Sequence, residues 1–373
     1  MSATTVEATP DAPVQATALI DCDLHPQLDN MADVLARVPK RIARQVAGQV
    51  GWVARDPNRI LHPTGNFRDD ARTPSGGSPG SDPAFARDVW LDAYDIAAAV
   101  LIPIQAGAVI PWADEAVAAA FLSAFNDQLI EDWCGTDMRY RALISVSPHD
   151  GEDAAREVER LADVPGVGGI NFPHAAVAMG RKHLYPLYAA ATRHGLPIVV
   201  HPSGGEGHQL GAPSRAGGVV RTYPEHHATL ILAGQAMLAS LVFGGVFEAF
   251  PTLKVVLSEY GWSWLAPLAR RMDAAWERGD PERSRLPRPP SSYIAGHVWF
   301  TTQPIDEPVP QQRLWPLLDV MWADRVLLFS ADYPHWDTDD PRVVLSSRIP
   351  SRLRERVACG NALDCFGAAR LGL

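Results

Sequence analysis

Cysteine is scarce in this sequence. Only four of the 373 residues are cysteines, and they are scattered at positions 22, 134, 359 and 365 without a CxxC pair. Closely spaced cysteine pairs are the signature of zinc knuckles and disulfide frameworks, so we expect neither here. Isolated cysteines are typical of proteins from a reducing compartment, and we therefore predict a cytoplasmic protein.

Basic residues are also fewer than acidic residues. Lysine and arginine total 33 against 43 aspartates and glutamates, which gives a formal net charge of −10. Proteins that bind the nucleic-acid backbone need a basic surface, so we expect no nucleic-acid partner. Charged residues make up 20% and hydrophobic residues 47% of the chain, which favours a globular protein over a disordered one.

The sequence offers no clear leader or membrane span. The first 17 residues lack a basic start and an apolar core, and their Ala, Thr and Pro predict a disordered tail. Residues 228–247 carry no charge, but they include Gln235 and five glycine, serine or threonine residues, and Glu248 follows directly. We interpret this segment as a buried helix that could also form a homodimer contact, and we expect no membrane partner.

Short apolar stretches alternate with longer amphipathic ones from residue 18 to the C-terminus. The apolar stretches are rich in Val, Ile and Leu without alternation, as in parallel strands buried on both faces. Eight strands with helices between them predict one (β/α)8 TIM barrel domain over residues 18–373. An open doubly wound sheet is the alternative, weakened because no GxGxxG follows the first strand. The predicted strands are 18–23, 98–103, 141–147, 167–172, 196–201, 254–259, 297–301 and 325–332, and the predicted helices are 112–134, 152–163, 183–194, 226–249, 262–277 and 309–323.

Two insertions interrupt this regular pattern. Residues 50–83 follow the first strand and residues 202–225 follow the fifth, and both are rich in glycine. Long loops at the carboxyl ends of barrel strands often form lids or substrate walls. We predict that both insertions lie at the barrel mouth, with a plain disordered surface loop as the alternative for residues 50–83.

Histidines and carboxylates occur where four of the predicted strands end. The segments are DCDLHP (21–26), VVHP (199–202), LSEYG (257–261) and FSADYPH (329–335). The carboxyl ends of barrel strands converge on one face, and alternate residues of an extended strand point to the same side. Each of these residues alone is more simply a cap or a hydrogen-bonded core residue. Their convergence from four strand ends predicts a metal site.

These motifs resemble those of the amidohydrolase-related, metal-dependent hydrolases, in the branch that also holds nonoxidative decarboxylases. The resemblance runs from about residue 18 to the C-terminus and rests on IDCDLH (20–25), IVVHP (198–202), SLVF (240–243), LSEYGWSWL (257–265) and SADYPH (330–335). It implies a barrel with a metal held by strands one, five and eight. On this resemblance His25, His201 and Asp332 match family ligand positions.

The sequence departs from the family pattern at three places. Asp23 replaces the first histidine of the usual HxH on strand one, and Glu259 stands where the family often has its catalytic histidine. Strand four ends in Asn-Phe-Pro-His (171–174), without the lysine that becomes the carbamate bridge of dinuclear relatives. The resemblance therefore leaves ordinary hydrolysis or decarboxylation without the family's proton-handling histidine.

Histidines near two of the motifs add candidates. His226 and His227 open the predicted helix after strand five, and one of them can face the site. We favour His227, because the resemblance places a Glu/His pair of this branch there; exposed helix residues are the alternative. His335 follows Asp332 by three residues and could orient it, or could be a turn residue.

The assembled candidate centre has more donors than one tetrahedral zinc requires. Three carboxylates and three imidazoles suit two divalent ions such as Fe(II) or manganese, and Glu259 or Asp332 could bridge them in place of the carbamate. The candidate metal ligands are Asp23, His25, His201, His227, Glu259 and Asp332, of which we predict Glu259, Asp332 and His227 to be catalytic.

Three functions follow from this centre. The resembled branch includes a nonheme diiron monooxygenase of bacterial terpenoid antibiotic biosynthesis, so our first prediction is an O₂-dependent hydroxylase of a small organic acid or acyl thioester. The alternative is a metal-dependent hydrolase or nonoxidative decarboxylase of a small carboxylic acid, with one zinc or manganese and with Glu259 or Asp332 as proton shuttle. A noncatalytic barrel that binds a small ligand is the third, disfavoured because buried ionisable groups are costly without a metal.

Overall fold

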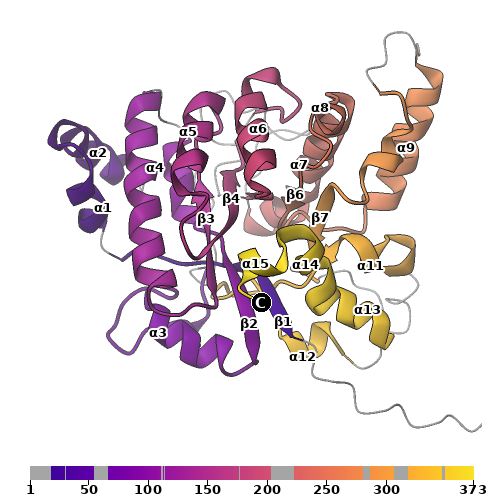
Figure 1. Ribbon diagram of the computed structural model, residues 1–373. Coiled ribbons are helices and arrows are strands. Elements are labelled where there is room, and N and C mark those ends of the chain that lie inside the picture. Colours follow the sequence, from indigo (N-terminus) through magenta and orange to yellow (C-terminus); the bar gives the residue numbers. More distant parts are fainter. Residues whose placement is uncertain are drawn as a thin grey trace, which may run out of the picture.

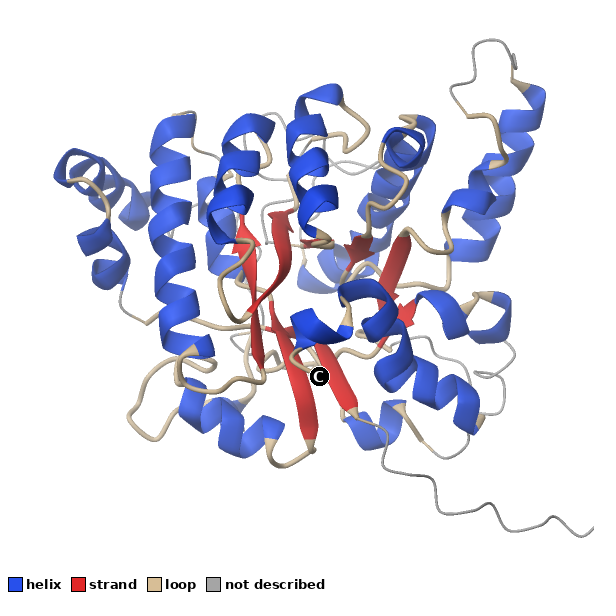
Figure 2. Cartoon of the chain, viewed as in Figure 1, coloured by secondary structure: helices blue, strands red, loops and turns tan. Residues whose placement is uncertain are grey.

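Eight parallel strands follow one another in chain order around a single sheet in the computed structural model, and helices surround them (Figures 1 and 2). This arrangement confirms the predicted (β/α)8 barrel. The structure describes residues 18–29, 31–53, 66–110, 112, 114–175, 177–202, 222–279, 286–305, 318–346 and 349–373. The strands are β1 (Leu19–Leu24), β2 (Ile96–Leu101), β3 (Tyr140–Ser145), β4 (Val167–Pro173), β5 (Ile198–His201), β6 (Val255–Leu257), β7 (Val298–Thr301) and β8 (Leu327–Leu328).

The helices form the outer layer around the strands (Figure 1). The α-helices are α1 (Met31–Arg37), α2 (Lys40–Val53), α3 (Pro83–Ala86), α4 (Glu115–Leu129), α5 (Gly151–Leu161), α6 (Tyr185–His194), α7 (Tyr223–Phe243), α8 (Val246–Ala249), α9 (Leu265–Arg278), α11 (Ala323–Val326), α12 (Pro341–Val344), α13 (Ser351–Glu355), α14 (Asn361–Phe366) and α15 (Ala368–Leu371). The 3₁₀ and π helices are η1 (Asp69–Ala71), η2 (Arg87–Leu91), η3 (Ile104–Val109), η4 (Ile130–Cys134), η5 (Lys182–Leu184), η6 (Pro290–Tyr293) and η7 (Arg356–Gly360).

The sixth and eighth strands are shorter than their apolar runs suggested. Glu259 has a φ of 64°, and so has Asp332. A left-handed backbone is incompatible with extended structure, so β6 stops before Glu259 and the predicted strand 325–332 cannot run through Asp332. The first part of that predicted strand is the short helix α11. The polar residues therefore lie in tight turns after the strands.

Parts of the predicted organisation lie outside the described residues. They include the tail at 1–17, residues 54–65 of the first insertion, residues 203–221 of the second, and most of the predicted helix 309–323. The described end of the first insertion lies at the mouth, where Phe67 pairs with His335 in an isolated bridge. The division into a tail and one barrel domain stays a prediction.

The interior of the barrel is filled by side chains and closed at its amino-terminal end. Inward-facing residues of seven strands form one buried cluster with residues of η7, α14 and α15, among them Cys22 of β1 and Cys365 of α14. The ammonium of Lys254, just before β6, donates to the carbonyl oxygens of Asp364 and Cys365 at 2.6 and 2.9 Å. The C-terminal helices are therefore the floor beneath the site, and the opposite end is the mouth.

Hydrogen bonds between β1 and the chain after β8 complete the barrel. The amide of Cys22 donates to Phe329 O at 3.0 Å, and the amide of Asp332 donates to Asp23 O at 3.0 Å. The buried carboxylate of Asp21 accepts from the amides of Asp23 at 3.2 Å and Ala331 at 3.0 Å. These bonds fix the two chain segments that carry Asp23 and Asp332 against each other.

Helix α7 is long and apolar enough to cross a membrane by length and composition alone, a test that core helices also pass. In this fold it is the outer helix after β5, and Leu230, Leu238 and Leu241 are buried on its inner face. Ile231 and Phe243 are exposed on its outer face. The homodimer contact and the cytoplasmic location stay predictions.

Gly234 lets α7 pack closely against the turn after β6. A Cβ at this position would lie 2.6 Å from Tyr260 Cβ and 3.2 Å from Trp264 Cζ2. We expect Gly234→Ala to destabilise the protein, because overpacking costs about 1–3 kcal/mol and exceeds the helix-propensity gain of roughly 1 kcal/mol. Urea unfolding of the metal-free protein measures the effect. Gly279→Ala, whose Cβ would meet nothing closer than 3.4 Å, is the control; equal midpoints for the two variants would refute the close-packing account.

Candidate metal centre

Four buried side chains converge at the carboxyl ends of β1, β5 and β8. One ligand-capable atom from each of Asp23, His25, His201 and Asp332 lies within 4.8 Å of the others. His25 Nε2 is 3.0 Å from Asp23 Oδ1 and 2.6 Å from Asp332 Oδ1, and His201 Nε2 is 3.5 Å from Asp23 Oδ2. We name these residues the four-donor group. The structure thus brings together four of the six predicted ligands.

The ring nitrogens of the two histidines are oriented for metal binding. His25 Nδ1 lies 2.8 Å from Ile102 O, and His201 Nδ1 lies 2.5 Å from Pro202 O. A carbonyl oxygen only accepts hydrogen bonds, so each Nδ1 carries the hydrogen and each Nε2 of a neutral ring presents a lone pair. Metal-bound histidines almost always donate their other N–H to such a partner.

The lone pairs of this group face one another. Within the described part of the chain, Asp23 Oδ1, His25 Nε2 and His201 Nε2 are buried and make no hydrogen bond. Nitrogen lone pairs directed at carboxylate oxygens are unfavourable in a buried site unless positive charge lies between them. The donor set therefore fits a divalent cation with mixed nitrogen and oxygen ligands, such as zinc, manganese or iron.

The pKa values of the group also show that the site stabilises positive charge. Burial by itself raises the pKa of Asp23, but His25 and His201 reverse this effect and hold that pKa well below its usual range. Burial by itself lowers the pKa of His201, but Asp23 and Glu259 raise it to about 10. Protons bound by the imidazoles would be displaced by a metal ion that supplies the same charge.

Hydrogen-bond donors hold both carboxylates of the four-donor group. His335 Nδ1 lies 2.6 Å from Asp332 Oδ1, and Gln303 Nε2 donates to Asp332 Oδ2 at 3.1 Å. The hydroxyl of Ser258 donates to Asp23 Oδ2 at 2.6 Å. The predicted contact between His335 and Asp332 is present. The sequence analysis did not single out Gln303, which lies outside the quoted motifs, or Ser258, which lies in LSEYG (257–261) beside the candidate Glu259.

The remaining predicted residues form a second set at the mouth. Glu259 Oε2 lies 3.0 Å from His201 Nε2, and Glu259 Oε1 lies 4.0 Å from His227 Nε2. His227 Nε2 is also 3.3 Å from Asp337 Oδ2. We name Glu259, His227 and Asp337 the mouth trio. The sequence analysis missed Asp337, because it follows the end of β8 by nine residues along an irregular segment.

Two features of the mouth trio bear on its chemistry. Burial raises the pKa of Glu259 despite the opposing contact with His201. His227 Nε2 faces carboxylate oxygens of Glu259 and Asp337, and the rings of His226 and His227 lie 6.2 and 6.0 Å from that of Tyr223. The preference for His227 over His226 as a metal ligand stays a prediction.

Aromatic side chains from three segments surround the mouth. The indole of Trp336 donates to the Tyr223 hydroxyl at 3.2 Å, and the Tyr223 ring stacks 6.0 Å from that of His227. The ring of Phe67 lies 5.5 Å from that of His335. We call Phe67, Tyr223 and Trp336 the aromatic rim, and it offers flat apolar surfaces beside the four-donor group.

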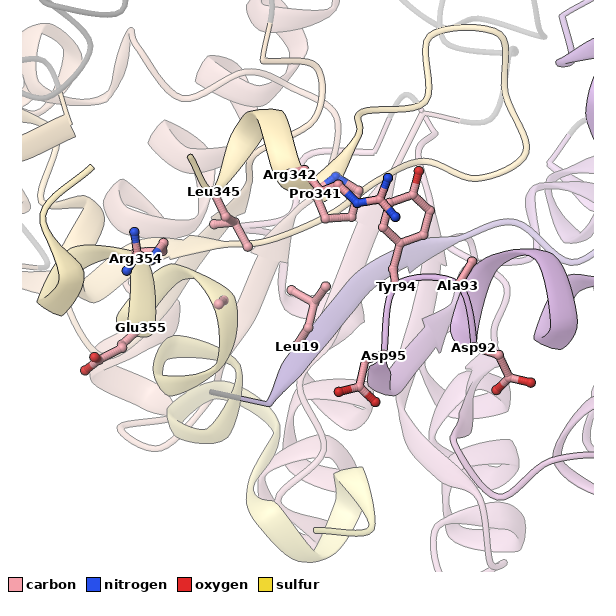
Figure 3. A pocket seen from close by; sticks show the side chains of 11 residues that line it. Leu19, Asp92, Ala93, Tyr94, Asp95, Pro341, Arg342, Leu345, Arg354 and Glu355 are labelled. Carbon is pink, nitrogen blue, oxygen red and sulfur yellow. The ribbon is translucent and has the colours of Figure 1, made fainter. Parts of the chain in front are cut away.

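A separate cleft of about 490 Å³ opens near the start of β1 (Figure 3). Leu19, Tyr94, Leu345 and Arg354 are among its lining residues. It lies beside the amino-terminal end of the barrel, away from the converging imidazoles and carboxylates. Buried ionisable groups with matched donors are the stronger mark of a catalytic site than open volume, so we place the candidate active site at the mouth.

The chain is similar to known proteins over almost its whole length. The family model described as amidohydrolase matches residues 20–368. A manganese-bound 5-carboxyvanillate decarboxylase from Novosphingobium aromaticivorans has a TM-score of 0.67 and 20% identity, over 95% of this chain and 97% of that one. A 2,6-dihydroxybenzoate decarboxylase from Rhizobium has a TM-score of 0.60 and 19% identity, over 95% and 99%.

An amidohydrolase from Mycobacterium avium subsp. paratuberculosis has a TM-score of 0.66 and 21% identity, over 95% of this chain and 100% of that one. At such identities these structures establish a shared fold. The family model covers far more than half of the sequence and includes all members of the four-donor group. The chain therefore belongs to the amidohydrolase family of metal-dependent enzymes.

Proposed function

We propose that this protein is a metal-dependent, nonoxidative decarboxylase of a small carboxylic acid. The observation that carries the proposal is the four-donor group, whose two carboxylates match the charge of one divalent ion and whose two imidazoles offer Nε2 lone pairs. Asp23, His25, His201 and Asp332 would hold this ion, with manganese or zinc suited to the mixed donors. This conclusion places our alternative prediction ahead of the diiron monooxygenase.

Similar structures support decarboxylation over hydrolysis. The fold matches enzymes named as decarboxylases of 5-carboxyvanillate and 2,6-dihydroxybenzoate over 94% and 95% of this chain. Those substrates are flat aromatic acids. The aromatic rim of this chain would pack against a flat ring, since stacked and edge-to-face ring pairs are favourable. We therefore propose an aromatic acid as the substrate.

The mechanism needs an acid at the carbon that loses CO₂. A bound divalent ion would supply Lewis-acid stabilisation of negative charge on the substrate's oxygens. Loss of CO₂ breaks the carbon–carbon bond and leaves its electron pair on the substrate carbon, which must take up one proton. Glu259 is suited to donate that proton, because its burial raises its pKa and it borders His201.

A diiron monooxygenase is the second candidate, and the mouth trio is the observation that favours it. Glu259 directs one carboxylate oxygen toward His201 and the other toward His227, so this side chain could help to hold a second ion beside the four-donor group. A second ion would be held by Glu259, His227 and Asp337. Iron, O₂ and an acyl thioester substrate remain predictions of this second candidate.

Reconstitution of the metal-free protein distinguishes the two functions. The protein is loaded anaerobically with Mn²⁺, Zn²⁺ or Fe²⁺, metals are counted per chain, and CO₂ release is measured with a panel of hydroxylated benzoic acids. We expect one ion per chain and CO₂ release without O₂. Two irons per chain with substrate-dependent O₂ uptake would overturn the decarboxylase and support the monooxygenase.

A further inference from the structure

The carboxylate of Asp332 is clamped at both oxygens. His335 Nδ1 lies 2.6 Å from Oδ1, and Gln303 Nε2 donates to Oδ2 at 3.1 Å. Both partners are buried, with Gln303 fully inaccessible and His335 6% exposed. Asp332 itself has a left-handed backbone, a conformation that few non-glycine residues adopt unless their surroundings hold them. The side chain is thus held in one orientation from two sides.

The imidazole of His335 is fixed in its turn. Its ring lies 4.5 Å from the ring of His25 and 5.5 Å from the ring of Phe67, tilted by 33° and 34°. Its backbone amide donates to Asp332 O at 2.9 Å, which closes the tight turn between the two residues. An ionised carboxylate only accepts hydrogen bonds, so Nδ1 of His335 carries the hydrogen.

We propose that His335 is the main positioning residue of the metal centre and that Gln303 assists it. Each oxygen of Asp332 has room for two partners. His335 takes one position on Oδ1 and Gln303 takes one on Oδ2, and Oδ1 also lies 2.6 Å from His25 Nε2, so the two partners set the direction in which this carboxylate faces the four-donor group. This inference rests on the proposed metal dependence, but it does not depend on the reaction or the substrate.

His335 combines two roles, hydrogen-bond donation to Asp332 and ring packing against His25 and Phe67, and two substitutions separate them. His335→Asn keeps a donor in the place of Nδ1 and loses the ring. His335→Phe keeps a ring between His25 and Phe67 and loses the donor. If the donor matters, His335→Phe weakens binding of the divalent ion about 10–100-fold, as removal of such partners usually does. His335→Asn then stays close to the wild type in affinity.

Binding of Mn²⁺ to the metal-free protein is the readout, followed by titration calorimetry or by the signal of free Mn²⁺ in electron paramagnetic resonance. The unfolding midpoint of each metal-free variant is measured beside it. A purely structural role gives the opposite order, in which His335→Asn loses more stability and at least as much affinity as His335→Phe. That order, or wild-type affinity in His335→Phe, overturns the inference.

Gln303→Met provides a second variant in case His335→Phe does not fold. Methionine fills a similar volume without a donor, and we expect a smaller loss of Mn²⁺ affinity with an unchanged unfolding midpoint. Wild-type affinity in this variant would overturn the role of Gln303. Failure of the proposed function is distinguishable, because a decarboxylase without metal dependence predicts that the wild-type protein itself binds no Mn²⁺.

Discussion

Asp332→Asn is expected to lose CO₂ release and to bind the divalent ion at least about 100-fold more weakly, beyond the range usual for outer hydrogen-bond partners. Asparagine preserves the shape of the side chain but removes one of the two negative charges of the four-donor group. Its amide also presents a donor or a neutral oxygen where His25 Nε2 now lies 2.6 Å from a carboxylate oxygen. Both effects oppose a cation at the centre.

Metal content after dialysis against Mn²⁺ and the rate of CO₂ release measure this effect. The matched control is Asp150→Asn, the same substitution at the N-cap of α5, where the side chain accepts from the amides of Glu152 and Asp153. Asparagine caps helices about as well as aspartate, so the control should retain metal and activity. An Asp332→Asn protein with a full complement of metal would rule out the four-donor group as the binding site.

Glu259→Gln is expected to retain one ion per chain and to slow CO₂ release by about 10²–10⁴-fold, the usual contribution of a positioned acid. The amide has the size of the carboxyl group but cannot give up a proton to the substrate carbon. Glu259 stands outside the four-donor group, so the first ion keeps all four donors. Loss of turnover with metal retained is the signature of a proton donor.

The same variant tests the second candidate function. If Glu259 holds a second ion with His227 and Asp337, Glu259→Gln should reduce the metal content from two ions per chain to one. Metal analysis and CO₂ release are measured on one preparation, with Glu131→Gln on the exposed surface as the control. Wild-type rates of CO₂ release in Glu259→Gln would remove Glu259 from the mechanism.

The sequence predicted those site residues that lie at the carboxyl ends of the barrel strands. His25, His201 and Asp332 could be predicted because the carboxyl ends of barrel strands meet on one face, whatever the details of packing. The same rule placed Glu259 nearby. The fold followed from apolar runs of strand length separated by amphipathic segments, since both periodicities are properties of local sequence.

Contacts made across the closed barrel could not be predicted. Gln303 and Ser258 meet the carboxylates of Asp332 and Asp23 only through the register of β6, β7 and the chain after β8. The left-handed turns at Glu259 and Asp332 were also hidden, because glutamate gives no signal for such a backbone and aspartate adopts it only occasionally. Asp337 could not be placed for the same reason, since it lies beyond the second of these turns.

On β1, inward-facing and outward-facing side chains do not alternate regularly along the strand. Cys22 belongs to the cluster inside the barrel, yet the adjacent Asp23 also lies in the four-donor group. The pairing of β1 with β2 shifts between Asp21 and Leu24, and such an irregularity changes which residues face inward. Asp23 and His25 lie together in the four-donor group as their spacing predicts, although this irregularity could not be detected from the sequence.

The centre joins the first strand of the barrel to the segment after the last, and this has a consequence for biosynthesis. Asp23 and His25 leave the ribosome early, whereas Asp332 follows on the order of 15–60 s later at about 5–20 residues per second. The floor beneath the site is made by η7, α14 and α15, close to the end of the chain. A growing chain that has not reached Asp332 thus holds only three members of the four-donor group, and the complete group can form only after that segment has been synthesised. A premature stop codon just beyond Asp332 would leave all four donors in the chain but would remove η7, α14 and α15, which pack against the inward-facing strand residues.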